Sequence, residues 1–459
     1  MPPVSDACHH LGHRPAPRRD TGLVSLAPKD VTAVFLVGGK GTRLGLGDIP
    51  KPMVDMQGIP LLQRMVTHLA DQGVRRFLML AGHGASYIEA HFAKHAPKGT
   101  TVDIVVETAP LGTAGSFTQL REHLDQPFLV VYGDVLFETD IARFLAFASE
   151  KGGAGTLYVH PNDHPEDSDL VDVDDDGLVR AFIAKPHQNP DCGNLVNAAF
   201  YLFDPVILSY LPDQTTEVID WGRDILPGIT AKGAHQLFAY RGSEYLKDIG
   251  TPKRIERGRR DFAAGTVAAR SYQHLQRAIF FDRDGVLNRE IDGVFKPDML
   301  DLIPGAGQAL YKVNKSGLLA IGVTNQPAIA KGFMSFEDLR QVHNRLDWAL
   351  AEEGGGYLDD LLYCPHHPER GFAGEREELK ITCECRKPAP GMLQTAADRH
   401  NIDLTRSWMI GDHARDIEAG LAAGCRCIVV GGAQHPQAES ATTVVEAVSM
   451  ILTKEGLAP

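Results

Sequence analysis

Short apolar runs alternate with segments of helical periodicity through the first half of the chain. The runs are nearly continuous in apolarity and rich in β-branched and aromatic residues, which is typical of buried parallel strands. They are Val31–Val37, Phe77–Ala81, Val102–Val106, Phe128–Tyr132 and Gly155–His160. Pro60–Gln72 and Ile141–Ser149 have the pattern of intervening helices. Residues 29–260 are therefore predicted to form one α/β layered domain.

The same alternation starts again near residue 277. Its apolar runs are Ala278–Phe281, Leu318–Val323, Ser407–Ile410 and Cys427–Val430. Ser335–Gly354 has the clearest helical pattern, with Ser335 as N-cap and Gly354–Gly356 as the end. Its core-facing stripe consists of Leu339, Val342, Leu346 and Leu350. A second α/β domain is predicted over residues 277–455.

Two further segments complete the predicted organisation. Residues 1–28 include a stretch rich in Pro, His and Arg, which predicts a disordered tail. Residues 261–276 belong to a charged, Ala-rich stretch and predict a linker helix between the domains.

The composition restricts the classes of function. The 459 residues are 43% hydrophobic and 23% charged, as in soluble globular proteins, and the net charge is −13. An acidic chain lacks the basic surface that nucleic acids and anionic membranes require. Because no run of 18 apolar residues and no apolar signal core is present, we expect a cytoplasmic protein without a membrane span. The seven cysteines then indicate free thiols or a metal site. Homo-oligomer formation is left open.

A glycine-rich turn follows the first predicted strand. It contains Gly38, Gly39, Gly41 and Thr42. Such a turn lets backbone N–H groups approach phosphates closely, and Arg43 and Lys51 add positive charge for a triphosphate. The turn alone is also compatible with a tight connection between a strand and a helix.

The segment Gly38–Leu44, followed by Pro50-Lys51-Pro52, resembles the signature of the sugar-1-phosphate nucleotidyltransferase family. The resemblance extends over most of residues 30–260 and implies a Rossmann-like, GT-A-like fold. It also implies the reaction, in which a sugar phosphate oxygen attacks the α-phosphorus of a nucleoside triphosphate and pyrophosphate leaves.

Other segments resemble further motifs of this family. The loop Pro110–Gly115, with Gly112, resembles the loop that lies against the nucleotide base. Asp134 and Asp248 fall in segments that resemble those with the Mg²⁺ ligands. By the same resemblance, Lys185 meets the sugar phosphate and Asn197 the sugar, while Arg43 and Lys51 help Mg²⁺ to align the anionic partners. The departures from the family pattern are Val37 and Ala184, which replace the usual Ala and Glu.

Four ordered motifs in the second half carry acidic, polar and basic residues at predicted strand ends. They are Asp282-Arg283-Asp284, Thr324-Asn325-Gln326, Arg386-Lys387-Pro388 and Gly411-Asp412. The set resembles the haloacid dehalogenase superfamily of phosphatases over residues 277–435, and implies a Rossmannoid fold. The resemblance implies that Asp282 attacks phosphorus and Asp284 serves as acid and base. Thr324 and Asn325 would hold phosphoryl oxygens, Lys387 would offset negative charge, and Asp282, Asp284 and Asp412, with Asp416 a further candidate, would form the Mg²⁺ site.

Three cysteines and a histidine form a candidate metal loop. They are Cys364, His366, Cys383 and Cys385, a donor set that suits structural tetrahedral Zn²⁺. The loop resembles the zinc loop of heptose 1,7-bisphosphate and histidinol-phosphate phosphatases, and this resemblance selects His366 over His367. The zinc would stiffen the loop that carries Arg386 and Lys387. Cys425 and Cys427 also have metal-like spacing, but their apolar context favours buried free thiols. The segment 324–332, including Gln326, resembles the heptose bisphosphatase version, whereas His413 replaces its usual cationic residue.

Together the two halves suggest consecutive steps of one pathway. The leading hypothesis is removal of the 7-phosphate of D-glycero-D-manno-heptose 1,7-bisphosphate, followed by nucleotidyl transfer to heptose 1-phosphate, with GTP favoured by the resemblance of the 110–115 loop. A second hypothesis keeps both reaction types with histidinol phosphate or another sugar phosphate, and a UDP-, ADP- or CDP-sugar product. A third is a domain decayed into a regulatory sensor, which the presence of the acidic and basic motif residues argues against. The sequence leaves open the base, the sugar anomer, the final glycan and any channelling.

Overall fold

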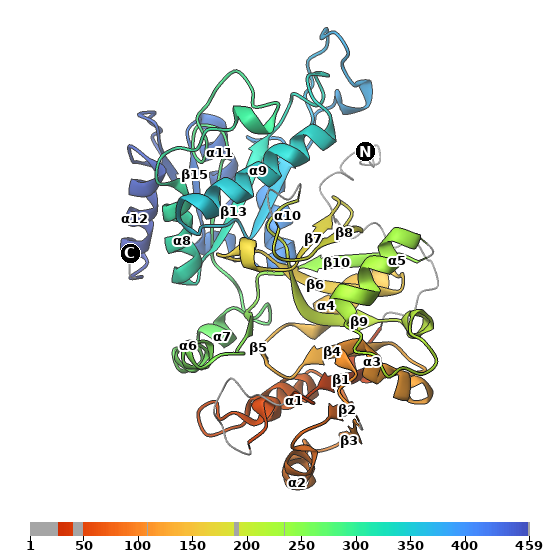
Figure 1. Cartoon of the computed structure of the whole chain (residues 1–459). Helices are drawn as coiled ribbons and strands as arrows, with labels where there is room; N and C mark the ends of the chain where they lie inside the picture. Colours follow the sequence, from red (N-terminus) through yellow and green to blue (C-terminus); the bar gives the residue numbers. More distant parts are fainter. Residues whose placement is uncertain (1–25, 40–48, 108, 188–191, 234, 458–459) are drawn as a thin grey trace, which may run out of the picture.

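The computed structural model describes residues 26–39, 49–107, 109–187, 192–233 and 235–457. These residues form two α/β domains, each built on its own sheet (Figure 1). The predicted tail up to residue 25, and Gly41, Thr42 and Arg43 of the glycine-rich turn, lie outside the described residues. No helix in the described ranges is long and apolar enough to cross a membrane.

The N-terminal sheet has the strand order β10-β6-β9-β4-β1-β2-β3. Its strands are β1 (Thr32–Leu36), β2 (Arg76–Ala81), β3 (Thr101–Val106), β4 (Phe128–Tyr132), β6 (Gly155–His160), β9 (Val196–Phe203) and β10 (Leu237–Arg241). β9 runs antiparallel between β4 and β6, whereas the other pairs along this path are parallel. A hairpin of β7 (Leu170–Val173) and β8 (Val179–Ile183) extends β9, and β5 (Val135–Phe137) pairs with β11 (Leu246–Asp248) separately.

Helices bury apolar residues on both faces of this sheet. One core contains residues of α1 (Leu61–Asp71), α2 (Ala85–His95), α4 (Ile141–Lys151), α6 (Pro252–Ala263) and α7 (Thr266–Ala269). The opposite core contains residues of α3 (Gly112–Gly115) and α5 (Leu226–Lys232). The predicted central strands and the helices at 60–72 and 141–149 are confirmed to within about two residues at each end.

The C-terminal sheet has the order β14-β13-β12-β15-β16-β17, and all of its pairs are parallel. Its strands are β12 (Ala278–Phe281), β13 (Leu319–Asn325), β14 (Asp360–Cys364), β15 (Trp408–Gly411), β16 (Arg426–Val429) and β17 (Glu439–Ser440). Residues of α8 (Ala306–Ser316), α9 (Phe336–Gly354) and α12 (Val444–Lys454) pack in one core. Residues of α10 (Gly391–His400) and α11 (Ala414–Ala423) pack in the other. This three-layer arrangement confirms the predicted α/β class.

The start and end of α9 confirm the signals in its sequence. The Ser335 hydroxyl accepts a hydrogen bond from the Asp338 N–H at 3.0 Å, and the Asp338 carboxylate accepts one from the Ser335 N–H at 2.7 Å. The two bonds form a reciprocal capping box. Gly355 ends the helix with a φ of 73°, a conformation that costs glycine little.

The connection between the domains differs from the predicted linker helix over 261–276. α6 begins earlier, at Pro252, and ends at Ala263, and the short α7 follows a turn at Gly265. Gly265 has a φ of 74°, so the chain leaves the helical conformation there. Residues 270–277 then enter β12 without a helix.

A buried chain of hydrogen bonds connects the two domains. The Tyr272 hydroxyl lies 2.5 Å from His400 Nδ1, and His400 Nε2 lies 3.0 Å from the Asp360 carboxylate. The backbone N–H of Ser243 donates to the same hydroxyl at 2.9 Å. Arg241 donates to the carbonyl of Asp359 at 2.8 Å, next to β14. The N-terminal domain therefore covers the edge strand of the C-terminal sheet, which would otherwise expose unpaired backbone groups.

Glu244 makes the stability of this interface depend on pH. Its carboxylate accepts hydrogen bonds from the backbone N–H groups of Asp140 at 2.7 Å and Tyr272 at 2.9 Å, and from the Tyr158 hydroxyl at 3.1 Å. Burial nevertheless raises the pKa of Glu244 to about 7. A raised acid pKa stabilises the folded state at low pH, and this contribution is lost as pH rises from about 4.5 to 7.

We expect Glu244→Gln to flatten the fall of the thermal midpoint between pH 5 and pH 8, because the amide keeps the acceptor but does not titrate. The difference in the free energy of unfolding between wild type and variant should change by a few kcal/mol over this pH range, since one pKa unit corresponds to about 1.4 kcal/mol. Differential scanning calorimetry across pH measures it. Parallel curves for wild type and variant would contradict the assignment. Glu290→Gln provides a control, because this carboxyl lies near Asp284 and Asp412 and not at the interface.

Candidate functional sites

Asp282 and Lys387 form a buried ion pair at the carboxyl end of the C-terminal sheet. Asp282 directly follows β12 and is 3% exposed, while Lys387 is 2% exposed. The Lys387 ammonium lies 2.8 Å from the Asp282 carboxylate and 2.7 Å from that of Asp416. It also donates to the carbonyl of Val323 at 2.8 Å. One cation therefore holds in place a carboxylate that follows β12 and one in the first turn of α11.

The Asp284 carboxylate is oriented by three neighbours. Arg283, which is fully buried, donates to both of its oxygens at 2.9 and 2.8 Å. Gln326 and Asn288 each donate to it at 2.9 Å. These contacts lower the pKa of Asp284, even though burial opposes the shift. Gln326 also donates to the Thr324 hydroxyl at 2.9 Å, which places the predicted β13 residues beside Asp284.

Asp412 lies directly against the loop that carries Asp284. A Cβ atom on Gly285 would lie 2.1 Å from an Asp412 carboxylate oxygen, and Gly285 has a φ of 80°. Asp412, His413 and Asp416 bring ligand atoms within 4.8 Å of one another. The acidic residues Asp282, Asp284, Asp412 and Asp416 thus outnumber the buried cations Lys387 and Arg283. This excess of oxygen donors fits a hard divalent cation such as Mg²⁺.

The carboxylates around Asp282 also outnumber the cations, and this excess affects the pKa of Asp282. Burial raises the pKa of Asp282 to about 8, assisted by the Asp416 and Asp284 carboxylates and opposed by Lys387. An ionised Asp282 is therefore costly unless more positive charge is present. Two hydrogen bonds also join the Lys387 loop to β13: the Asn325 side-chain amide donates to the Lys387 carbonyl and accepts from the Lys387 N–H, both at 3.0 Å.

Three thiols and one imidazole converge beside this loop. The Cys385 sulfur lies 3.3 Å from that of Cys364, 3.2 Å from that of Cys383 and 3.3 Å from His366 Nδ1. These separations and the donor types fit one tetrahedrally coordinated metal ion. The structure brings His366, and not His367, to the cysteines. Arg386 donates to the His366 carbonyl at 3.2 Å, so the cluster is coupled to the residues before Lys387.

A second acidic pair lies in the N-terminal domain. Asp134 follows β4 and pairs with Lys51, and Asp248 ends β11 and pairs with Arg254. β11 pairs with β5, and the N–H of Ile249 donates to the Asp134 carbonyl at 2.8 Å. The two predicted Mg²⁺ ligands are therefore neighbours across one ladder, and each forms an ion pair with a basic side chain.

The glycine-rich turn begins where β1 ends. Gly38 is packed so closely that a Cβ atom would lie 1.9 Å from the Glu107 carboxylate, whereas Gly39 has open space. Gly112 has a φ of 80° and lies against the carbonyl of Ile219, where a Cβ atom would be 2.5 Å away. Close backbone packing therefore requires a glycine at position 112, whereas at position 38 the close neighbour is the end of the Glu107 side chain.

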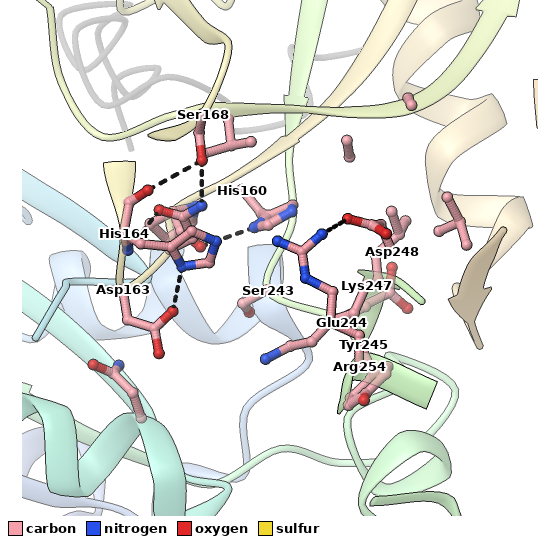
Figure 2. Close-up of a pocket in the computed structure, with 18 of the residues that line it drawn as sticks. His160, Asp163, His164, Ser168, Ser243, Glu244, Tyr245, Lys247, Asp248 and Arg254 are labelled. Atoms are coloured by element: carbon pink, nitrogen blue, oxygen red, sulfur yellow. Dashed lines mark hydrogen bonds and ion pairs between the residues drawn. The ribbon is translucent and has the colours of Figure 1, made fainter. Parts of the chain in front are cut away.

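The acidic pair opens into a cleft of about 490 Å³ that reaches the C-terminal domain. Asp134, Lys185, Asn197 and Asp248 all line it, so the structure brings these predicted residues together. Figure 2 shows Asp163, His164 and Ser168 on one side of the cleft, and Lys247, Asp248 and Arg254 on the other. The volume lies within the range of small-molecule sites.

Several residues of these sites were missing from the sequence-based set. They are Glu107, Asp163, Lys247, Arg254, Asn288 and Lys315. Asn288 lies four residues after Asp284, and Lys247 and Arg254 flank the predicted ligand Asp248, so these three had a local signal. The others meet the sites through long-range packing, which a single sequence does not reveal.

Comparisons with known proteins identify both halves. Residues 32–264 match the nucleotidyl transferase family model, and residues 384–451 match a model described as HAD-hydrolase-like. The D-glycero-beta-D-manno-heptose-1,7-bisphosphate 7-phosphatase of Haemophilus ducreyi is 40% identical over 155 residues, which are 34% of this chain and 82% of that protein.

Two solved structures are also similar. HddC from Yersinia pseudotuberculosis, complexed with GMP-PN, is 30% identical with a TM-score of 0.43 and covers 50% of this chain and 99% of its own. The D,D-heptose 1.7-bisphosphate phosphatase from B. bronchiseptica, complexed with magnesium and phosphate, is 29% identical with a TM-score of 0.35 and covers 39% of this chain and 99% of its own.

We expect the purified chain to contain one tightly bound metal ion per molecule at the thiol cluster. Cys385→Ser should lose this ion and lower the thermal midpoint, because a structural site contributes directly to folding. Elemental analysis and a thermal melt measure the two effects. Cys425→Ser is the matched control, since Cys425 is a buried free thiol outside the cluster. A metal-free wild-type protein, or equal metal content in both variants, would contradict the assignment.

Proposed function

Because the chain belongs to the nucleotidyl transferase family over residues 32–264 and to the heptose bisphosphate phosphatase family over its C-terminal third, we propose that it is one bifunctional enzyme of activated heptose synthesis. Its phosphatase would remove the 7-phosphate of D-glycero-D-manno-heptose 1,7-bisphosphate. Its transferase would then join heptose 1-phosphate to a nucleotide, with GTP as the favoured donor. The first product is the second substrate, so the two reactions form a sequence.

In the phosphatase reaction, the Asp282 carboxylate attacks phosphorus and the bond from phosphorus to the 7-oxygen breaks. Arg283, Gln326 and Asn288 fix the position of the Asp284 carboxylate. The negatively charged substrate phosphate would favour the protonated form of Asp284, which would then give its proton to the leaving oxygen. Water then attacks the aspartyl phosphate, Asp284 takes its proton, and phosphate leaves with Asp282 restored. Lys387 neutralises Asp282, and Thr324 and Asn325 bind the phosphoryl oxygens.

Mg²⁺ held by Asp282 and Asp412 would supply the positive charge that this acidic site lacks. Zn²⁺ would be held by Cys364, His366, Cys383 and Cys385. Because Arg386 contacts the His366 carbonyl, the zinc loop would fix the position of the following Lys387. The neutralising lysine would then stay aligned with Asp282 between turnovers.

In the transferase reaction, the sugar phosphate oxygen attacks the α-phosphorus and pyrophosphate leaves. Asp134 and Asp248 would hold Mg²⁺, and Lys51 would offset the charge of the triphosphate together with Arg43. Lys185 and Asn197 line the same cleft, where they would bind the acceptor phosphate and sugar. Gly38 and Gly39 with Gly41 and Thr42 would approach the triphosphate, and Gly112 the base.

The observation that carries the choice of substrate is the 40% identity to a heptose 7-phosphatase over 82% of that protein. The alternative is histidinol phosphate or another sugar phosphate, with a different base in the product. Mass spectrometry of the purified chain with heptose 1,7-bisphosphate, Mg²⁺ and each nucleoside triphosphate separates the two.

We expect a nucleotide heptose, phosphate and pyrophosphate to appear together, and only with GTP. Phosphate release with no nucleotide sugar from any triphosphate would contradict the assigned transferase substrate. No phosphate release would contradict the assigned phosphatase substrate and favour the alternative.

Asp282→Asn should abolish phosphate release while nucleotidyl transfer to heptose 1-phosphate stays within about twofold. The loss should reach roughly a thousandfold, because the variant lacks the attacking carboxylate. The reciprocal variant Asp134→Asn should lose nucleotidyl transfer and keep phosphate release. Separate assays of phosphate and pyrophosphate measure the two rates, and loss of both activities in either variant would contradict independent sites.

A further inference from the structure

The cleft of the N-terminal domain is closed at one end by the C-terminal domain. Asp134 and Asp248 line the cleft together with Asn314 and Lys315 from the end of α8 and Tyr357 from the loop before β14. These three residues come from the amino-terminal edge of the C-terminal sheet. The site is therefore completed by a domain that has a separate active centre.

Four cationic side chains meet at this end of the cleft. This interdomain cation cluster consists of Lys247, Arg257, Arg270 and Lys315. The other three all lie near enough to Lys247 to repel its ammonium. Such a convergence is unfavourable in a neutral environment, so its position in a cavity indicates a negatively charged occupant.

Three members of the cluster already have partners. Lys315 pairs with Asp163 at 2.5 Å across the domain boundary. Arg270 donates to the carbonyl of Asn314 at 2.9 Å. Arg257 lies 3.9 Å from the Asp261 carboxylate.

Lys247 differs from the other three. Among the described residues, its ammonium has no hydrogen-bond or ion-pair partner. The ammonium lies 5.6 Å from the centroid of the Tyr245 ring. The nearby carboxylates are engaged elsewhere: Asp163 with Lys315 and His164, and Asp261 with the Tyr245 hydroxyl. Asp359 accepts from the N–H of Ala320 at 2.8 Å. A half-buried ammonium thus faces the cleft without an anion of its own.

We propose that Lys247 and Lys315, one from each domain, bind a phosphate group at the interdomain end of the transferase cleft. The inference rests on the proposed function, in which the acceptor sugar 1-phosphate occupies this cleft near Asp134. The hydroxyl groups of the sugar carry no charge, so an uncompensated ammonium is better matched to a phosphate.

Two sources of phosphate fit the chemistry. One is the far phosphate of the sugar bisphosphate that the C-terminal domain hydrolyses, and the other is the inorganic phosphate that it releases. Either one would compete with the sugar 1-phosphate for the cleft. The transferase would then slow while the bisphosphate or its released phosphate is abundant.

Equilibrium dialysis of the full chain tests this proposal without measuring catalysis. The Asp282→Asn chain is used as the parent so that the bisphosphate stays intact, and the probes are heptose 1,7-bisphosphate and inorganic phosphate, each alone. We expect two equivalents of at least one probe to bind, one in each domain. Lys247→Met and Lys315→Met, made separately in the parent, should weaken one equivalent at least tenfold and leave the other unchanged.

The equivalent that remains in the C-terminal domain shows that the variants are folded. Lys312→Met, which removes the same charge from an exposed position one turn earlier on α8, should bind like the parent. Loss of binding for both probes identifies free phosphate as sufficient, whereas loss for the bisphosphate alone identifies the sugar-borne phosphate. Unchanged binding of both probes in Lys247→Met would overturn the proposal. Failure of the proposed function would instead appear as absent nucleotidyl transfer in the Asp134-intact parent, whatever the dialysis gives.

Discussion

The hydrogen-bond chain that runs from Ser243 through Tyr272 and His400 to Asp360 determines how the two domains sit together. It is buried, so each of its members depends on the next one for a partner. Asp360 begins the edge strand of one sheet, and Glu244, next to Ser243, accepts from the backbone of the segment that carries Tyr272. Moving one domain against the other would leave several buried polar groups unpaired. This chain, together with the Lys315–Asp163 ion pair, therefore holds the two domains that line the cleft in their relative positions.

Both active centres use the same physical arrangement. Carboxylates gather beside strand ends, after the neighbouring parallel strands β12 and β15 in one centre and beside the antiparallel pair β5–β11 in the other. In each centre one lysine offsets part of their charge. Lys387 does this for Asp282 and Asp416, and Lys51 does it for Asp134. In the C-terminal centre the carboxylates outnumber the buried cations, and this excess favours a divalent cation. In the N-terminal centre Lys51 and Arg254 each pair with one of the two aspartates.

Much of the fold could be predicted from the sequence because its central strands are apolar and the residues that begin and end its helices are typical caps. Ser335 and Gly355 mark the two ends of α9. The cysteine loop contains all four candidate metal ligands within a short stretch of sequence. Of the antiparallel strand β9, only Asn197 entered the predictions, as a sugar contact, because the insertion of this strand between β4 and β6 has no local signature. Lys315 could not be predicted as a site residue, because it reaches the cleft only where two domains meet. Lys247 and Arg254 flank Asp248 in the sequence, but the sequence alone did not show that their side chains line the cleft.

The direction of the C-terminal strands determines how far the two active centres are separated. Asp282 lies at the carboxyl edge of the sheet, and the wall of the cleft belongs to its amino edge. The four residues of β12 alone separate these edges by roughly 13 Å, at about 3.3 Å per residue. In the proposed reaction sequence, a sugar phosphate that leaves one centre would travel around the packed sheet before it reaches the other. What the covalent fusion provides is equal copy numbers of two catalysts, so that neither supply nor demand for the intermediate can outgrow the other through expression alone.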